Sequence, residues 1–187
     1  RDQGVTVTHT PGHNALSVAE HAMTLTLACA RRLPTAADLL SEGRWRDEYP
    51  LGTQLSGSTI GIVGFGNVGK RVGKLFSGFD VDVMVSDPYV PSIDPELADA
   101  EQRPLDAVLS QSDVVILTPE LTDETRDLIG TDELARMKSS AIVVNGSRGP
   151  VVDQAALVDA LEADEIAAAG LDVFADEPLD SDSPLLS

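Results

Sequence analysis

The sequence predicts an α/β protein with a doubly wound parallel sheet and helices on both of its faces, which makes three layers. Three observations predict this fold. Short apolar runs alternate with helical stretches from Thr59 onward, one of these runs leads directly into the pattern Gly-x-Gly-x-x-Gly, and 42% of the 187 residues are hydrophobic. Buried apolar strands that alternate with helices are typical of parallel sheets, because each crossover between strands lays a helix on a face.

Before Thr59 the pattern predicts one strand and two helices. The strand is expected over Val5–Thr8 and is followed by a loop at Thr10–Asn14. The run Ser17–Glu20 has the form of a capping box, and the apolar residues after it predict a helix that is buried nearly all round and ends near Arg32. A second, more polar helix is expected over Thr35–Gly43.

From Thr59 onward we expect five strands, four helices and one long loop. The strands are predicted at Ile60–Val63, Val81–Val85, Val114–Leu117, Ile142–Val144 and Ala167–Leu171. The helices are predicted near Val68–Ser77, Leu105–Ser110, Asp132–Met137 and Gln154–Glu162. Residues 88–104 are rich in Pro, Asp and Glu, which predicts an exposed loop.

The glycine pattern lies between the first of these strands and the first of these helices, an order that suits a Rossmann dinucleotide site. Gly64 allows a tight turn, Gly66 lets the backbone approach a pyrophosphate, and Gly69 lets helix and strand pack closely. The helix N-terminus, at Asn67 and Val68, adds free N–H groups and about half a unit of positive charge. Alone the pattern is weak, because glycine-rich turns occur in many unrelated loops.

Asp87 makes the dinucleotide interpretation more specific. It ends the second strand, 18 positions after Gly69, close to the spacing of about 20 at which an acidic residue accepts hydrogen bonds from an adenosine ribose. A carboxylate there also repels a 2′-phosphate, which favours NAD over NADP. The alternative is that Asp87 only ends a strand before a proline turn.

Two polar segments follow the later strands. Arg148 comes directly after Asn145-Gly146-Ser147, where its guanidinium is placed to bind a carboxylate, because ligands bind at the carboxyl ends of parallel strands. Asp172 follows the last strand and would lie near a nicotinamide. From the residues alone, the simpler interpretation of Arg148 is an exposed arginine in a glycine-rich turn, because most arginines are exposed. Glu177 could likewise be one more solvated acid.

The composition narrows the setting of the protein. With 31 acidic and 13 basic residues the formal net charge is −18, which excludes favourable binding to nucleic acid or to an anionic membrane. Such an acidic surface with few lysines suggests a salt-loving source and predicts lower stability at low salt. No apolar run is long enough to span a membrane. The single cysteine, Cys29, allows no disulfide framework, and together these features favour a cytoplasmic protein.

Several separate motifs occur in one order along nearly the whole chain. They are Thr10-Pro-Gly-x-Asn14, Ser17-Val-Ala-Glu20-His21, Gly43-Arg-Trp45, Gly64–Gly69, Asp87-Pro-Tyr89, Leu121-Thr-x-Glu-Thr-Arg126, Met137-Lys138, Val144-Asn-x-x-Arg-Gly149, Val152-Asp153, Leu171-Asp-Val-Phe174 and Glu177-Pro-Leu179. In this combination the chain resembles the NAD-binding domain of the D-isomer-specific 2-hydroxyacid dehydrogenases, a family that includes D-3-phosphoglycerate, D-lactate and glyoxylate/hydroxypyruvate enzymes.

The resemblance implies roles for the residues that match the family's motifs. Arg148 would be catalytic, binding the carboxylate of a 2-oxo acid and polarising its 2-oxo group. Glu177, 29 positions later (177 − 148), would be catalytic by orienting a histidine and raising its pKa. The full set of expected NAD contacts is Gly64, Gly66, Asn67, Val68, Gly69, Asp87, Thr118, Gly146, Ser147, Arg148 and Asp172, with the register of Thr118 defined only to within one residue. No metal is expected.

The resemblance also implies that this chain holds only part of such an enzyme. The family's catalytic histidine is expected beyond Glu177 and is absent, and none of the histidines present, at positions 9, 13 and 21, takes its place. His13 is expected to be solvated and His21 to be a structural histidine on a buried helix. Residues 1–16 are interpreted as a remnant of the substrate domain and its connection, and residues 17–187 as the NAD-binding Rossmann domain, truncated at both ends.

The expected function is hydride transfer between NAD(H) and a D-2-hydroxy or 2-oxo acid, of the phosphoglycerate or glyoxylate/hydroxypyruvate type. This chain alone is expected to bind NADH without turning over a 2-oxo acid. Family members are usually dimers, so a homodimer is expected. The alternative is a non-catalytic NAD-sensing module that resembles the corepressors of the family, and a third is another Rossmann oxidoreductase with a similar loop.

Overall fold

The computed structural model describes residues 6, 8, 10–45, 48–49, 51–90, 93 and 100–186. The helices are α1 (Ala15–Ala30), α2 (Leu33–Ser41), α3 (Asn67–Phe76), α4 (Leu105–Gln111), α5 (Thr131–Leu134) and α6 (Gln154–Glu162). The strands are β1 (Thr59–Val63), β2 (Asp82–Ser86), β3 (Ala100–Gln102), β4 (Val114–Leu117), β5 (Ile142–Asn145) and β6 (Ala168–Leu171). Short 3-10 helices cover Gly149–Val151 and Pro184–Leu186.

All six strands form one parallel sheet in the order β3-β2-β1-β4-β5-β6. The chain builds one half of the sheet outward from β1 and then crosses to build the other half from β4, so the strand order reverses between β1 and β4. This is the doubly wound arrangement of the Rossmann fold, and it confirms the predicted fold class.

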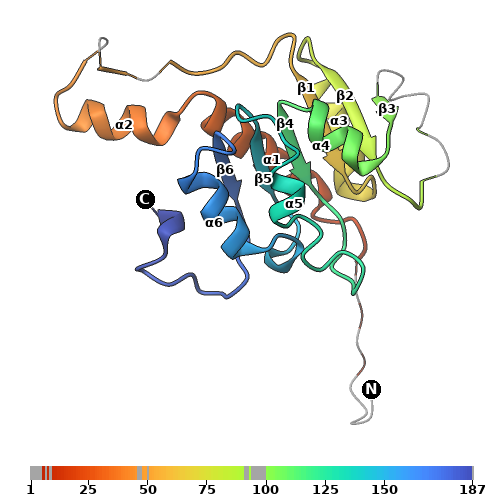
Figure 1. Cartoon of the computed structure of the whole chain (residues 1–187). Coiled ribbons are helices and arrows are strands. Elements are labelled where there is room, and N and C mark those ends of the chain that lie inside the picture. The colour runs from red at the N-terminus through yellow and green to blue at the C-terminus, as the bar shows by residue number, and fades with distance from the viewer. Residues whose placement is uncertain are drawn as a thin grey trace.

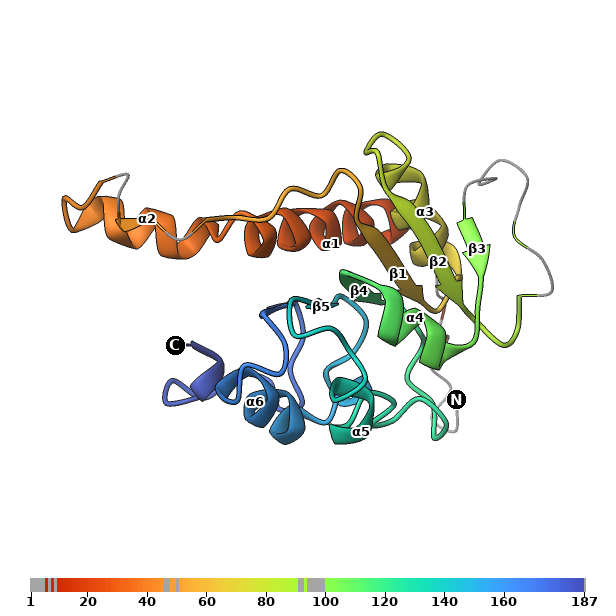
Figure 2. The same ribbon diagram turned by 45° about the horizontal axis from the view of Figure 1, so that its top comes forward.

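Helices cover both faces of the sheet, as Figures 1 and 2 show. Helices α1 and α3 pack together on one face, and α4, α5 and α6 lie on the other. Alternate strand residues serve the two faces: Ile60 and Ile62 join the cluster beneath α1 and α3, whereas Val63 joins the cluster beneath α4 to α6. Because successive strand side chains point to opposite faces, a strand covered on both sides reads as a continuous apolar run.

The later helices begin where their local signals place them. Asp153 caps α6 by accepting hydrogen bonds from the N–H groups of Ala155 and Ala156, and the bounds of α6 match the prediction. The predicted strands β1, β2, β4, β5 and β6 and the predicted helices α3, α4 and α5 are all present, with ends that differ by up to three residues. Within the described ranges, no helix combines the length and apolar character that crossing a bilayer requires.

The prediction for α1 was wrong in its start and in its burial. The helix begins at Ala15 after Asn14, without a side-chain cap, so Ser17 lies inside the helix and no capping box forms. The turn at Gly12, with φ of +72°, already directs the chain into the helix. Its fully buried residues form a single stripe of small side chains, namely Ala15, Ala19, Ala22, Thr26 and Ala30. The stripe faces the sheet and α3 while the opposite side faces solvent, because the helix covers one face only.

Two further predictions differ from the structure. Residues 88–104 contain the edge strand β3, which sequence patterning missed because Ala100-Glu101-Gln102 has no β-branched or aromatic residue; it is a strand because it pairs with Val83–Val85 of β2. The strand predicted over Val5–Thr8 falls partly outside the described residues, and Thr6 and Thr8 lie in no strand.

Helix α2 differs from the others because none of its residues is buried. It continues beyond the end of α1 and projects away from the sheet (Figure 2). Its side chains Leu33 and Leu40 are 60% and 53% exposed, and Trp45 and Leu51 in the segment after it are 70% and 94% exposed. Large apolar side chains gathered on one projecting segment are typical of an interaction surface.

Candidate functional site

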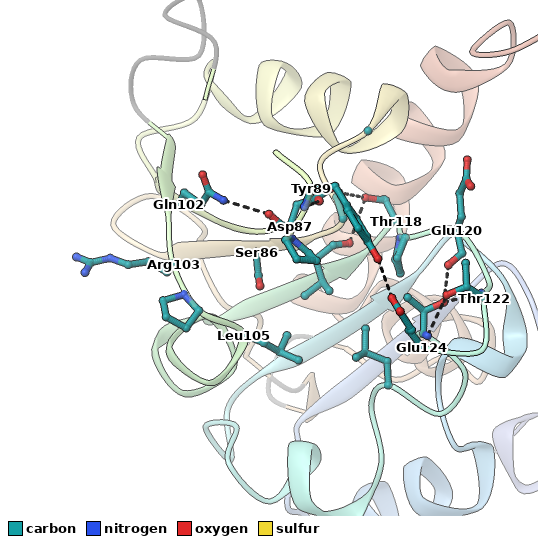
Figure 3. A pocket seen from close by; sticks show the side chains of 18 residues that line it. Ser86, Asp87, Tyr89, Gln102, Arg103, Leu105, Thr118, Glu120, Thr122 and Glu124 are labelled. Carbon is teal, nitrogen blue, oxygen red and sulfur yellow. Dashed lines mark hydrogen bonds between the residues drawn. The ribbon is translucent and has the colours of Figure 1, made fainter. Parts of the chain in front are cut away.

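A cleft of about 810 Å³ lies where β1, β2 and β4 end. Its lining comes from the loops that follow these strands, including Gly64, Asp87, Thr118 and Glu124, and from Arg103–Leu105 at the start of α4 (Figure 3). The carboxyl ends of strands on either side of the reversal in strand order form the usual ligand site of open α/β sheets. The volume falls within the range of small-molecule sites.

The loop after β1 requires glycine at two positions for different reasons. Gly64 has φ of +86°, and a Cβ there would lie 2.6 Å from the backbone nitrogen of Pro119. Its N–H donates to the carbonyl oxygen of Ser86 at 2.8 Å. At Gly69, in the first turn of α3, a Cβ would overlap the carbonyl oxygen of Gly64 and approach Thr118 Oγ1 at 3.0 Å. The predicted tight turn and close packing are therefore both present.

Gly66 is different, because a Cβ there would meet nothing within 4 Å. It is the residue before α3, and no side chain caps this helix end. Asn67 is exposed and Val68 half-buried at the first turn. The first N–H groups of a helix have no partner within the helix, so an open space beside them favours an anion. Packing within the fold therefore does not require glycine at position 66, and the space beside Gly66 is open.

Asp87 joins the ends of β1 and β2. Its Oδ2 accepts the N–H of Phe65 at 2.6 Å, and its Oδ1 accepts the N–H of Tyr89 at 2.8 Å. Asp87 therefore does close a turn, as the alternative interpretation held. A carboxylate has about four acceptor sites, so these two bonds leave capacity for the hydroxyls of a ligand.

Thr118 fixes the third side of the cleft. Its N–H continues β4 by donating to Val63 O at 2.8 Å, and its hydroxyl donates to Gly64 O at 2.6 Å. Thr118 thus lies directly against the glycine turn and lines the cleft. The sequence defined the register of Thr118 only to within one position, and in the structure it is Thr118 itself that contacts the glycine turn.

The loop after β5 is organised by Asn145, a residue for which the sequence suggested no role. Asn145 is 1% exposed. Its Oδ1 accepts the N–H and the hydroxyl of Ser147 at 3.0 and 2.8 Å, and its Nδ2 donates to Arg148 O at 3.0 Å. An apolar strand that ends in a buried asparagine is the signal that could have identified it, because a buried amide must satisfy both its donor and its acceptor.

The predicted residues around this loop have different environments. Ser147 is buried, so its hydroxyl faces Asn145. Gly146 lies near Val18 and Ala22 of α1. Arg148 is exposed, and its Nη1 donates to the carbonyl oxygen of Ser147 at 2.7 Å.

Arg148 and Glu177 come from neighbouring segments. At Gly149 a Cβ would overlap the backbone at Phe174, so the two loops are in close contact. Glu177 is exposed and accepts the Phe174 N–H on Oε1 at 3.1 Å. The structure thus brings the backbones of the two predicted catalytic segments together. Neither residue lines the cleft at β1, β2 and β4, so the predicted catalytic residues lie in a different region of the described chain from the cleft.

Asp172 and His21 form a contact that the sequence did not predict. Asp172, after β6, and His21, on α1, lie 3.4 Å apart between Oδ1 and Nε2. Their side chains are 44% and 48% exposed, so the prediction that His21 is buried was wrong. The exposed side of α1 carries it, opposite the buried stripe. His13 is exposed, as expected. In the described residues, no group of three or more His, Cys, Asp or Glu side chains is arranged to hold a metal ion.

The family model for the NAD binding domain of the D-isomer specific 2-hydroxyacid dehydrogenases matches residues 23–187. The chain belongs to this family. The membership confirms the resemblance carried by the motifs, and it confirms NAD as the cofactor of the domain. The glycine turn with its open space at Gly66 and the acceptor capacity of Asp87 fit such a group.

Relatives of this dehydrogenase domain include enzymes with different names. The chain is 40% identical over 184 residues to D-3-phosphoglycerate dehydrogenase from Archaeoglobus fulgidus, covering 98% of this chain and 35% of that protein. It is 40% identical over 178 residues to hydroxypyruvate reductase from Thermotoga maritima, covering 95% of this chain and 57% of that protein. The chain thus spans between about one third and somewhat over half of these relatives.

A solved structure with cofactor supports the same family. The NAD-dependent formate dehydrogenase from Staphylococcus aureus, in complex with NAD, matches with a TM-score of 0.86 and 32% identity, covering 92% of this chain and 53% of that one. This relative is an NAD-dependent enzyme, and the family model that matches the present chain is that of the NAD-binding domain.

Proposed function

We propose that the cleft at the ends of β1, β2 and β4 holds NAD(H) through the residues predicted from the sequence. Gly64, Gly66 and Gly69, with the N–H groups at Asn67 and Val68, would hold the pyrophosphate. Asp87 would accept the hydroxyls of the adenosine ribose. The observation that supports this most directly is the 2.6 Å bond from Phe65 N–H to Asp87, because it fixes the carboxylate beside the glycine turn.

The second region would serve the chemistry. Arg148 is exposed and follows β5, where its guanidinium can pair with the carboxylate of a 2-oxo acid and polarise the 2-oxo group. Thr118, Gly146, Ser147 and Asp172 would complete the cofactor contacts. When bound, NADH supplies a hydride to C2 of the 2-oxo acid. The hydrogen bond from the buried Asn145 amide to the Arg148 carbonyl supports this role, because it fixes the Arg148 backbone.

Glu177 would orient the histidine that protonates the substrate oxygen. Its bond to Phe174 N–H leaves acceptor capacity for a histidine N–H. His21 is paired with Asp172 rather than with Glu177, and we expect the required histidine outside these 187 residues. The full enzyme would transfer hydride between NAD(H) and a D-2-hydroxy acid of the phosphoglycerate or glyoxylate/hydroxypyruvate type.

A titration of the chain with NADH, followed by NADH fluorescence, tests this proposal. We expect saturable binding, no oxidation of the bound NADH by glyoxylate, hydroxypyruvate or phosphohydroxypyruvate, and turnover of one of these acids when a substrate domain is supplied on the same polypeptide. Absence of NADH binding, or steady oxidation by the 187 residues alone, would contradict it.

We also propose that α2 joins two copies of the chain into a homodimer. The support is its exposure: no α2 residue is buried, and Leu33 and Leu40 are more than half exposed. Light scattering after size exclusion should give twice the mass of 19.7 kDa, and Leu33→Glu with Leu40→Glu should give a monomer. The acidic surface and the lone Cys29 support a cytoplasmic setting in a salt-loving cell.

A further inference from the structure

A hydrogen bond joins the two sides of the cleft at its mouth. The Tyr89 hydroxyl donates to Glu124 Oε2 at 2.7 Å. Tyr89 belongs to the loop after β2 and Glu124 to the loop after β4, and both line the cleft. In Figure 3 the Tyr89 ring points toward Glu124 from the side of Asp87.

The loop that carries Tyr89 is held in place independently of this bond. Its N–H donates to Asp87 Oδ1 at 2.8 Å. The side chain of Gln102, on β3, donates to the carbonyl oxygens of Asp87 and Val90 at 3.1 and 2.9 Å. These bonds fix the turn at both of its ends, so Tyr89 is presented from an anchored loop.

The loop that carries Glu124 is also built by its own bonds. Thr125 Oγ1 donates to Glu120 O at 2.6 Å, and the Thr122 N–H donates to Thr125 Oγ1 at 2.8 Å. The Thr125 N–H donates back to Thr122 Oγ1 at 3.3 Å. Such local side-chain bonds shape a turn without help from distant residues. Within the described residues, the Tyr89–Glu124 bond is the side-chain hydrogen bond that connects these two loops across the cleft.

The bond forms a wall of the cleft and does not fill it. The cleft has its volume of about 810 Å³ with the bond in place. Much of the remaining lining is apolar, including Val63, Leu105 and Leu128. A space bounded by apolar side chains and an aromatic ring suits a flat, weakly polar group such as a purine base.

The bond is also weak enough to open. Tyr89 is 77% exposed, and a hydrogen bond in contact with water contributes little to stability. A tyrosine hydroxyl already keeps its proton at neutral pH, and the hydrogen bond to Glu124 raises the pKa of Tyr89 further, so the hydroxyl is a donor there. The Tyr89–Glu124 bond can therefore open to let a ligand enter the cleft. Once it has formed again, it must break before the ligand can leave.

We propose that Tyr89 and Glu124 form a latch that closes the cleft over the adenosine end of NAD(H) and sets its dissociation rate. This inference rests on the proposed function, which places the adenosine ribose at Asp87, two residues before Tyr89. Within the described part of the chain, neither latch residue forms a hydrogen bond with the segments of Arg148 and Glu177. The latch therefore affects the dissociation rate of the dinucleotide and does not contact the reacting atoms.

Stopped-flow displacement of NADH from the chain by excess ADP-ribose tests the latch. Tyr89→Phe keeps the ring and removes the hydroxyl, and it should raise the dissociation rate constant of NADH by about three- to tenfold. In a Glu124→Ala background the same change should alter this constant less than twofold, because the bond is already absent. Removing the negative charge of Glu124 would by itself weaken the repulsion of the NADH phosphates and slow NADH dissociation. Loss of the hydrogen bond should instead speed dissociation, so the two effects have opposite signs.

Two controls localise the effect. Tyr49→Phe alters the chain's other tyrosine, which precedes β1 and does not line the cleft, and it should leave NADH dissociation unchanged. Reduced nicotinamide mononucleotide lacks the adenosine half, and its affinity should be the same for the wild type and Tyr89→Phe. Thermal melting of each variant should stay within about 2 °C of the wild type, as expected for an exposed hydroxyl.

The outcomes separate the latch from the proposed function. If the wild type binds no NADH, the proposed function fails and the latch fails with it. If the wild type binds NADH and Tyr89→Phe dissociates at the wild-type rate, the latch alone is overturned. An equal loss of affinity for NADH and for reduced nicotinamide mononucleotide would also overturn it, because the effect would not lie at the adenosine end.

Discussion

Replacing Asn145 with alanine should destabilise the domain more than any other asparagine change in the chain. Asn145 is 1% exposed, and its side chain satisfies the Ser147 N–H, the Ser147 hydroxyl and the Arg148 carbonyl. The hydroxyl can rotate toward another partner, and the carbonyl belongs to an exposed residue, so the Ser147 N–H bears the full penalty. With about 1–3 kcal/mol for one unsatisfied buried group and a smaller loss for the others, we expect about 2–4 kcal/mol.

Urea unfolding followed by far-ultraviolet circular dichroism measures this loss. Asn14→Ala is the matched control, because Asn14 precedes α1 without a side-chain cap bond, and it should change the free energy of unfolding by less than about 0.5 kcal/mol. A loss below about 1 kcal/mol for Asn145→Ala would refute the argument, because it would mean that the three bonds do not hold the loop.

Asn145→Asp adds a test of the hydrogen-bond directions. An ionised aspartate accepts from Ser147 but cannot donate to Arg148 O, and burial raises its pKa above its ordinary value of about 3.9. The folded variant then binds a proton more readily than the unfolded chain. Its stability relative to the wild type should therefore rise as the pH falls from 7 toward 4. A constant difference across this range would contradict the assigned directions.

Three further predictions concern the glycine turn, a partly buried carboxylate and the surface charge. Gly66→Ala should keep the melting temperature, because its Cβ meets only open space, and should abolish NADH binding, because that space is the proposed pyrophosphate site. Gly69→Ala should lower both the melting temperature and the NADH affinity, because its Cβ overlaps Gly64 O. Equal behaviour of the two variants in melting and titration would contradict this. Partial burial raises the pKa of Asp113, but the hydrogen bonds from Lys138 and from the Thr59 N–H outweigh it and hold this pKa below its ordinary value. Asp113 should thus stabilise the fold above its ordinary pKa and lose this effect as the pH falls through its lowered folded pKa. The stability advantage of the wild type over Asp113→Asn should therefore shrink in acid unfolding curves. With a net charge of −18, the melting temperature should rise from low to molar KCl, and an unchanged value would exclude self-repulsion as a major term.

The sheet could be predicted from the sequence because its strands are covered on both faces. Ile60–Val63, Val114–Leu117 and Ile142–Val144 are continuous apolar runs, and such runs are typical of strands covered on both faces. β3 could not be predicted, because Ala100–Gln102 is a strand only through its pairing with β2. Local sequence carries no signal for a partner that lies elsewhere in the chain.

The candidate site likewise contains some features that the sequence predicted and some that it could not predict. The tight turn at Gly64 and the close packing at Gly69 could be predicted, because backbone geometry demands glycine there and the motif records that demand. Thr118 was expected only from the family resemblance, with its register defined to within one residue. The roles of Asn145 and of the Tyr89–Glu124 bond were missed. Tyr89 and Glu124 are 35 positions apart, and they meet only because β2 and β4 flank β1 in the sheet. The burial of α1 was overestimated because an apolar helix that lies on one face of a sheet keeps a solvent side.

The ratio of the dissociation constants of NADPH and NADH, measured for the wild type and for Asp87→Asn, tests the central claim most directly. Asparagine keeps the shape and an acceptor oxygen but removes the charge that repels a 2′-phosphate. Like charges about 4 Å apart repel by about 1 kcal/mol in water and by more at a protein surface, and a phosphate carries more than one charge. We predict that the wild type prefers NADH at least about tenfold and that Asp87→Asn reduces the preference severalfold. Equal affinity of the wild type for both dinucleotides, or an unchanged ratio in the variant, would contradict the assignment of Asp87 to the ribose.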